Sequence, residues 1–137
     1  MPRAELSVMC AKRLEDLIIW QLANELKDEL FQLLTETSVS MDWKFRIEIT
    51  DAMSSVTRNM SEGFGRFHHK EFAQFLKYSR GFLYEVSDDL RDGVKRRYWT
   101  TARIEKGIIL SKRTTKAVTK FMLYLRNTPD WNGSDPP

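Results

Sequence analysis

The sequence predicts an all-α protein, an antiparallel up-down four-helix bundle, over residues 13–127. Four long segments carry apolar residues three and four positions apart, which is the spacing of an amphipathic helix. Short polar connections separate these segments, and none shows the alternation typical of a strand. Helices joined in this way pack as antiparallel neighbours, each covering the apolar face of the next. Residues 1–12 form an N-terminal segment, and residues 128–137 are expected to be a disordered tail.

The first helix is expected from about Arg13 to Thr35. Its apolar surface is wider than the roughly 100° stripe of a simple surface helix, so we expect it to be central or buried against another subunit. A ridge with a spacing of four residues follows its length: Leu14, Ile18, Leu22, Leu26, Leu30 and Leu34. Four aromatic residues lie partly off the core stripes of the chain and are expected to fill a seam between subunits, the alternative being scattered surface positions: Trp20, Phe31, Tyr78 and Phe82.

The other three helices follow after a loop at residues 35–40, with Ser40 or Asp42 as the next N-cap. The second helix is expected at about 42–62, the third at about 70–97 and the fourth from 100 or 101 to about 127. Gly81 and Gly93 each cost the third helix about 1 kcal/mol relative to Ala, which favours close helix approach or a local bend. The predicted core stripe of the fourth helix is Ile104, Ile108, Val118, Met122 and Leu125.

The connection between the second and third helices contains a structural turn motif, which comprises Asn59, Glu62, Gly63, Gly65 and Arg66. Both glycines are able to adopt the left-handed backbone that ends a helix. Glu62 and Arg66 stand four residues apart and are expected to form a salt bridge, and Asn59 is expected to bond backbone at the turn. A catalytic role for Glu62 as a general base is disfavoured, because no nucleophile or second acid stands at a defined spacing from it.

Composition is typical of a single globular domain, with 137 residues, 42% apolar and 30% charged. No apolar run approaches the ~18 residues of a membrane span, and the N-terminus lacks the apolar core of a signal peptide. The single cysteine, Cys10, excludes an internal disulfide framework and fits a reducing compartment. We therefore expect a cytoplasmic protein without a membrane partner.

Charge is distributed unevenly along the chain. Residues 1–90 carry 11 Lys and Arg against 15 Asp and Glu, a balance of −4, whereas residues 91–126 carry 11 against two, a balance of +9. Lys112, Lys116 and Lys120 form one helical ridge with no acid between them, opposite the core stripe. This pattern indicates either a solvated face paired with nearby acids or a surface that binds a polyanion. The candidate nucleic-acid-binding residues are Lys95, Arg96, Arg97, Lys106, Lys112, Arg113, Lys116 and Lys120.

Tyr98 and Trp99 adjoin the basic run Lys95-Arg96-Arg97. Aromatic side chains beside cations can stack on unpaired bases, although such residues more often cap the end of a bundle. His68 and His69 are poor metal-ligand candidates, because adjacent residues point to different faces of a helix and His68-x-x-Glu71 occurs only once, in reverse order. We expect no metal, no cofactor and no catalytic residue.

Three motifs resemble the four-helix bundle proteins first noted in intervening sequences of bacterial large-subunit ribosomal RNA. The motifs are Asp16-Leu17-Ile18-Ile19-Trp20 with Ala23 and Leu26, the run Asn59-Met60-Ser61-Glu62-Gly63-Phe64-Gly65-Arg66, and Glu71-Phe72 with Phe75-Leu76, Gly81 and Glu85. The chain departs from the family pattern at His68 and Phe82, where serines are usual, and at Ser38-Val39-Ser40, which replaces a proline-bearing loop.

The resemblance implies a homo-oligomer, a pentameric ring of bundles, and kinship with the accessory variability determinant of diversity-generating retroelements. That accessory protein is a basic scaffold that contacts nucleic acid and a reverse transcriptase. Together with the basic ridge, the resemblance predicts a non-enzymatic scaffold that binds RNA or DNA. The alternative is a scaffold for protein–protein interaction that has no role with nucleic acid, in which the basic face meets an acidic partner or the acidic helices of its own chain.

Overall fold

The computed structural model describes residues 13–130, which are all-α and contain no strand. A single 3-10 turn, η1 (Leu14–Asp16), precedes five α-helices. These are α2 (Ile18–Leu34), α3 (Thr37–Ser40), α4 (Trp43–Phe64), α5 (His69–Lys95) and α6 (Thr101–Asn127). No helix in this part of the chain has the length and apolar character that crossing a bilayer requires.

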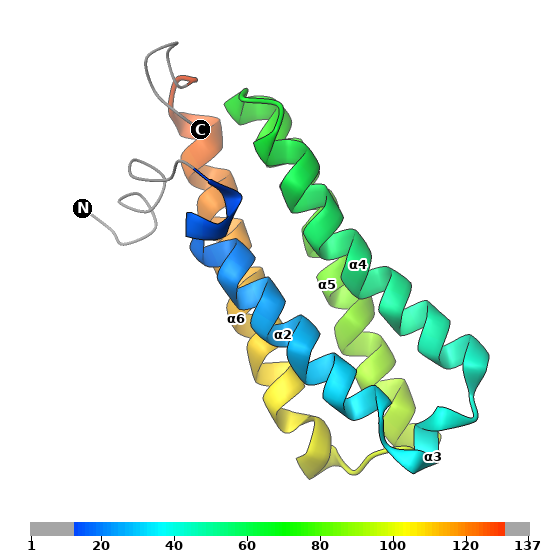
Figure 1. Cartoon of the computed structure of the whole chain (residues 1–137). Coiled ribbons are helices and arrows are strands. Elements are labelled where there is room, and N and C mark those ends of the chain that lie inside the picture. The colour runs from blue at the N-terminus through cyan, green and yellow to red at the C-terminus, as the bar shows by residue number, and fades with distance from the viewer. Residues whose placement is uncertain (1–12, 131–137) are drawn as a thin grey trace.

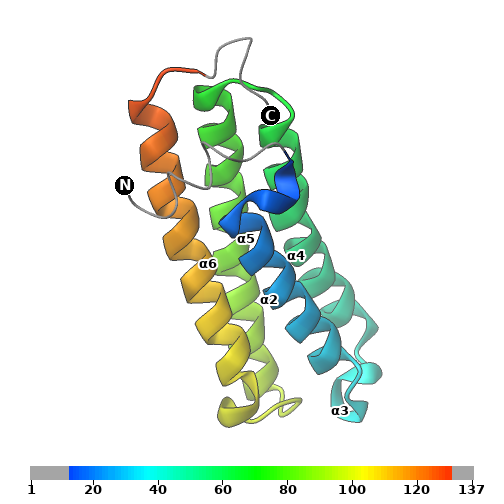
Figure 2. The same ribbon diagram turned by 60° about the vertical axis from the view of Figure 1, so that its left-hand side comes forward.

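The four long helices lie side by side and form a helical bundle (Figures 1 and 2). The α4–α5 connection lies at one end of the bundle, and the α5–α6 connection lies at the other end, beside the short helix α3. Helix α5 packs against α4 and α6, and α2 packs against the same two helices from the other side. Helices α4 and α6 are therefore separated from each other by α2 and α5.

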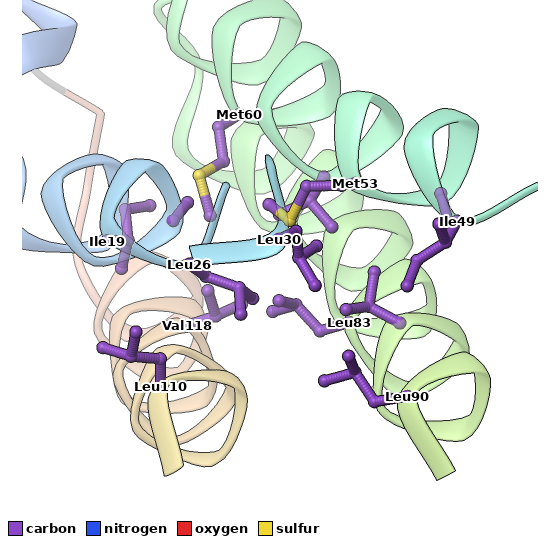
Figure 3. Packing of buried hydrophobic residues seen from close by; sticks show 14 of the residues in the cluster. Ile19, Leu26, Leu30, Ile49, Met53, Met60, Leu83, Leu90, Leu110 and Val118 are labelled. Atoms are coloured by element: carbon purple, nitrogen blue, oxygen red, sulfur yellow. The ribbon is translucent and has the colours of Figure 1, made fainter. Parts of the chain in front are cut away.

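The core lies where the inner faces of the four long helices meet (Figure 3). Residues of α2, α4, α5 and α6 converge there, among them Leu26, Met53, Leu83 and Val118, each no more than 1% exposed. At about 25 cal/mol per Å² of apolar surface removed from water, this burial is the main force that holds the helices together.

Helix α2 starts later than the sequence predicts. Leu17 adopts an extended backbone (φ −78°, ψ 133°), which separates η1 from α2. The predicted ridge of spacing four is also only partly correct, because Ile18 and Leu22 are half-buried while Ile19 and Ala23 are buried. The core side of α2 alternates spacings of four and three, as expected for a helix of 3.6 residues per turn.

The predicted loop at 35–40 contains the short helix α3, and Asp42 is the N-cap of α4, since its carboxylate accepts a hydrogen bond from the Phe45 amide at 3.1 Å. Helix α6 begins as predicted. The hydroxyl of its N-cap, Thr100, accepts from the Arg103 amide at 3.0 Å. Such caps are worth about 1 kcal/mol each.

The α4–α5 turn corrects the prediction for its glycines. No described glycine has a positive φ; Gly63 lies within α4, and Gly65 closes the helix with φ −70°. Gly63 is needed for a different reason, because a Cβ atom there would lie 2.6 Å from the Phe72 ring and 2.9 Å from the Phe75 Cβ. The left-handed residue of the turn is Phe67, with φ 60°. Gly63 therefore allows α4 and α5 to approach closely.

The polar residues of the motif hold the end of α4. Arg66 Nη2 contacts Glu62 Oε1 at 2.8 Å, as predicted, and the Arg66 guanidinium lies over the Phe75 ring at 5.2 Å. Asn59 bonds backbone, but its partner is the Ser55 carbonyl one turn earlier in α4 and not the turn itself. Glu62 and Arg66 are both exposed, so their pair contributes only a few tenths of a kcal/mol.

Candidate nucleic-acid interface

Helix α6 sets the orientation of the predicted basic residues. Ile104, Val118, Met122 and Leu125 are buried, as the sequence predicts, whereas Ile108 is only half-buried. Further buried residues of α6 were missed by the predicted stripe: Gly107, Leu110, Ser111, Thr114 and Phe121. Because these buried positions occupy the inner half of the helix, the remaining positions face outward.

Lys112, Lys116 and Lys120, hereafter the lysine ridge, are exposed on this outer side of α6, and Arg113 is exposed beside them. Four residues of helix rise about 6 Å, so the ridge extends about 12 Å along α6. Within residues 13–130, no carboxylate lies within 4.0 Å of any of these four cationic groups. The ridge therefore presents a row of unneutralised charge.

Among the other predicted residues, Lys106 has a carboxylate partner. Lys106 Nζ lies 3.5 Å from Glu29 Oε2, and Glu29 is 4% exposed. Arg103 Nη1 contacts the other oxygen of Glu29 at 3.0 Å, and its Nε contacts Glu36 at 2.5 Å. Lys106 thus belongs to an ion cluster that joins α6 to α2, and this neutralises part of its charge.

Arg96 is also paired. Its Nε lies 2.8 Å from Asp92 Oδ2, and its Nη1 lies 3.2 Å from Asp42 Oδ2. The hydrogen bond from the Tyr98 hydroxyl, followed by that from the Phe45 amide, lowers the pKa of Asp42 below its usual range. The Asp42 carboxylate therefore stays charged and holds Arg96 at the end of the bundle.

The remaining residues of the basic turn, Lys95 and Arg97, are exposed and have no ion pair among the described residues. Arg97 adopts a left-handed backbone (φ 66°), and its amide donates to the Val94 carbonyl while the Tyr98 amide donates to the Gly93 carbonyl. This pair of bonds is the Schellman ending of a helix, at a position usually filled by glycine. The bonds fix where the basic turn projects from α5.

Of the two alternatives for the aromatic residues, the structure favours capping. Trp99 is 4% exposed and donates from Nε1 to the Leu33 carbonyl at 3.1 Å. Tyr98 is half-buried, and its ring packs edge-on against Phe45. Trp99 also explains Gly93, where a Cβ atom would lie 2.4 Å from the indole ring. Trp99 is therefore covered and closes the end of the bundle, and Tyr98 packs partly against it.

Two cations of α5 that lie at the α5–α6 seam, Arg80 and Arg91, are not among the residues predicted from the sequence. Arg80 Nη1 donates to Thr119 Oγ1 at 3.3 Å, and Arg91 lines a surface hollow together with Ile108 of α6. Residues 80 and 91 are eleven apart, three helical turns, and therefore lie on one side of α5. The helical periodicity of α5 is sufficient to place Arg80 and Arg91 on one side of the helix, whereas a count of charge by segment does not show this. The basic surface thus extends from α6 onto α5.

Acidic residues gather on a different side of the bundle. A hollow between α4 and α5 is lined by five carboxylates: Glu48, Asp51, Glu85, Asp88 and Asp89. Burial, followed by the nearby charge of Glu48, raises the pKa of Asp89 to about 6. Because five carboxylates line the hollow and their charges add to the effect of burial, the hollow is a region of negative potential.

The histidines lie next to the end of α6. His68 Nδ1 is 3.2 Å from Asp130 Oδ2, and the His69 amide donates to Asp130 Oδ1 at 2.8 Å, which caps α5 from a distant part of the chain. These two bonds, the amide first, lower the pKa of Asp130. Within residues 13–130 no group of three His, Cys, Asp or Glu is placed to hold a metal ion; Cys10 and the tail beyond residue 130 lie outside the described residues.

The chain matches a known protein family. The family model described as 23S rRNA-intervening sequence protein matches residues 15–120, which include all four long helices as far as the last lysine of the ridge. No curated protein and no solved structure gives a significant match.

Proposed function

This chain belongs to the 23S rRNA-intervening sequence protein family, and from that premise we propose that it is a non-enzymatic nucleic-acid-binding scaffold. Its four long helices form an antiparallel up-down bundle, its ligand is RNA in the first place, and its contact surface is centred on the lysine ridge. The cytoplasm is the proposed compartment.

The unneutralised lysine ridge supports this proposal most directly. Like charges four residues apart repel each other by a few tenths of a kcal/mol, and the described chain supplies no carboxylate to offset this cost. Phosphates of a nucleic acid would neutralise such a row, and the release of counterions would make binding depend on salt and little on sequence. Arg113, Lys95 and Arg97 extend the proposed surface, whereas the paired residues Arg96 and Lys106 contribute less.

Measuring RNA affinity as a function of salt tests the proposal. In the variant Lys112→Gln/Lys116→Gln/Lys120→Gln, the slope of log K against log salt should fall by about 2 for single-stranded RNA, since each lost contact removes about 0.7. The matched control Lys44→Gln/Arg58→Gln/Lys70→Gln removes the same charge from exposed positions off α6 and should leave most of the slope in place. Equal slopes for the two variants, or no RNA affinity at low salt, would refute the proposal.

We further propose that the bundle assembles as a homo-oligomeric ring, with five subunits as the expected number. Large apolar side chains are exposed at the start of α4, where Met41 is 90%, Trp43 68% and Ile47 41% exposed. Of the predicted seam residues, Phe31 and Tyr78 are about half exposed, while Trp20 and Phe82 pack partly against the core. Contact with another copy would bury these surfaces. A stable monomer at micromolar concentration, measured as mass in solution, would remove this part of the proposal.

The second candidate function is a scaffold that binds only proteins. The observation in its favour is the acidic hollow between α4 and α5, which offers carboxylates to a basic surface of another copy or of a partner such as a reverse transcriptase. Two results together would favour this candidate: wild-type protein that does not bind RNA, and a lysine-ridge variant that loses its oligomeric state.

A further inference from the structure

A surface hollow lies between α5 and α6, close to the lysine ridge. It has a volume of about 750 Å³, within the range of small-molecule sites. Val94 of α5 and Ile104 and Ile108 of α6 supply apolar side chains, and Arg91 and Lys95 of α5 supply cations. The hollow therefore combines an apolar surface with positive charge on one side.

The hollow is continuous with the ridge. Ile108 and Lys112 stand four residues apart on α6, so the first lysine of the ridge lies about 6 Å along the helix from the apolar surface. A nucleic-acid strand whose phosphates contact the lysine ridge and that runs toward the start of α6 would contact the hollow directly after Lys112. Arg91 and Lys95 then meet the strand from α5, on the other side of the hollow.

We propose that this hollow accepts an unpaired base of the bound nucleic acid, so that the ligand class is RNA with unpaired nucleotides rather than fully paired duplex. The inference rests on the proposed function and specifies its ligand. A nucleobase has two apolar faces, which match Val94, Ile104 and Ile108, and it is attached to a phosphate, which matches Arg91 and Lys95. Glu105, also at the hollow, is an acceptor for an exocyclic amine of the base.

A phosphate alone would contact only the cations of the hollow, because a charged phosphate gains nothing from the apolar side chains. The bases of a duplex are paired and stacked, so they cannot enter a hollow on a protein surface, whereas bases in loops, bulges and single strands can turn outward. The aromatic residues of the neighbouring turn do not perform this role, since Trp99 is buried and Tyr98 packs against Phe45. The binding surface therefore recognises a base by burial beside aliphatic side chains.

Two adjacent isoleucines provide a matched pair of variants. Ile108 is half-buried and lines the hollow, whereas Ile109 is 48% exposed and lines an adjoining depression on the α2 side of α6. Ile108→Glu and Ile109→Glu place the same charge on the same helix one residue apart. The probes are a labelled single-stranded RNA of about 20 nucleotides without self-complementarity and the blunt duplex of the same sequence.

We expect wild type to bind the single strand more tightly than the duplex. Ile108→Glu should weaken single-strand binding about five- to tenfold more than Ile109→Glu does, while the two variants should affect duplex binding equally. A second variant, Arg91→Gln, provides the test if Ile108→Glu does not fold, because Arg91 is exposed on the cationic side of the hollow. It should weaken single-strand binding more than the control Arg58→Gln, which lies on α4.

The outcomes separate this inference from the proposed function. Absence of binding to either probe refutes both. Equal affinity of wild type for the two probes, with Ile108→Glu and Ile109→Glu indistinguishable, overturns the base site and leaves the ridge proposal in place. A loss of oligomeric state in Ile108→Glu alone, with both affinities falling together, would assign the hollow to a subunit contact and would also overturn the inference.

Discussion

Two glycines of the bundle should respond in opposite ways to the same substitution by alanine. Gly81 lies within α5 and is exposed, and a Cβ atom built there meets nothing within 4 Å. Gly63 lies within α4 and is buried, and its Cβ atom would lie 2.6 Å from the Phe72 ring and 2.9 Å from the Phe75 Cβ. The sequence predicts Gly63 at a turn and Gly81 inside a helix, whereas in the structure both lie inside helices and differ in what surrounds them.

The expected magnitudes follow from two effects. Alanine is favoured over glycine inside a helix by about 1 kcal/mol, so Gly81→Ala should raise the free energy of unfolding by about that amount. Gly63→Ala gains the same propensity but forces α4 away from α5, because the Phe75 Cβ is fixed to its backbone and cannot turn aside. Overpacking of this kind costs typically 1–3 kcal/mol. The two variants should therefore differ by about 2 kcal/mol.

Urea unfolding followed by circular dichroism at one protein concentration measures this difference. Fixing the concentration matters, since the apparent stability of an oligomer depends on it. For a chain of this length, 1 kcal/mol corresponds to about 3–4 °C in Tm, so the two variants should be separated by about 7 °C. Unchanged m-values would show that the substitutions alter stability without altering the compactness of the folded or the unfolded chain.

Either of two results would refute this reasoning. Gly63→Ala at least as stable as wild type would mean that α4 and α5 are not held as closely as their contacts indicate. Gly81→Ala less stable than wild type, by an amount that changes with protein concentration, would mean that another copy packs on this part of α5. The predicted seam residues Tyr78 and Phe82 flank Gly81, so the second result would also locate the subunit contact.

Two further predictions concern charged groups. The carboxyl of Asp89 binds its proton more tightly in the folded chain, with a pKa of about 6 against an ordinary 3.8, so its contribution to stability should fall as the pH rises through this window. Asp89→Asn should therefore stabilise the protein above about pH 7, by on the order of 1 kcal/mol after solvent screening, and by much less near pH 4; an equal gain at both pH values would contradict this. Arg103→Met should destabilise the chain by about 2 kcal/mol, because buried Glu29 keeps only Lys106, at 3.5 Å, as a partner. Glu29→Leu/Arg103→Met should recover most of that loss in urea unfolding, and failure to recover would show that Arg103 acts through packing and not through its charge.

The four long helices follow from the sequence because apolar periodicity is a local property. The four long helices lie where the spacing of apolar residues places them, within a few residues at each end. The break between η1 and α2 at Leu17 cannot be predicted from this periodicity, because the apolar residues keep their helical spacing on both sides of Leu17. Gly63 was misassigned for a similar reason. Its role depends on Phe72 and Phe75 of the next helix, which the spacing within α4 does not reveal.

The candidate surface likewise has a part that the sequence predicts and a part that depends on tertiary contacts. The lysine ridge is contained in one helix, so a helical wheel is sufficient to find it. Lys106 pairs with Glu29, and Arg96 pairs with Asp42 in addition to Asp92; Glu29 and Asp42 lie more than fifty residues earlier in the chain. No count of charge by segment predicts these pairings, and the +9 balance of residues 91–126 therefore overstates the charge available to a ligand. Conversely, that count omitted Arg80, which the packing of α5 on α6 brings to the basic side.

The net charge of the chain does not describe its surface, because the fold places the cationic and the anionic side chains on different sides. The acidic hollow belongs to α4 and α5, while the lysine ridge lies on α6, and α2 and α5 separate α4 from α6. Packed helices stand about 8–10 Å apart, so diagonal helices are separated by more than the Debye length of about 8 Å at physiological salt. Carboxylates of α4 are therefore largely screened from a ligand on the ridge. The proposed polyanion at α6 would therefore meet a cationic surface even though the whole chain carries only +3, and the acidic side would disfavour its binding in any other orientation.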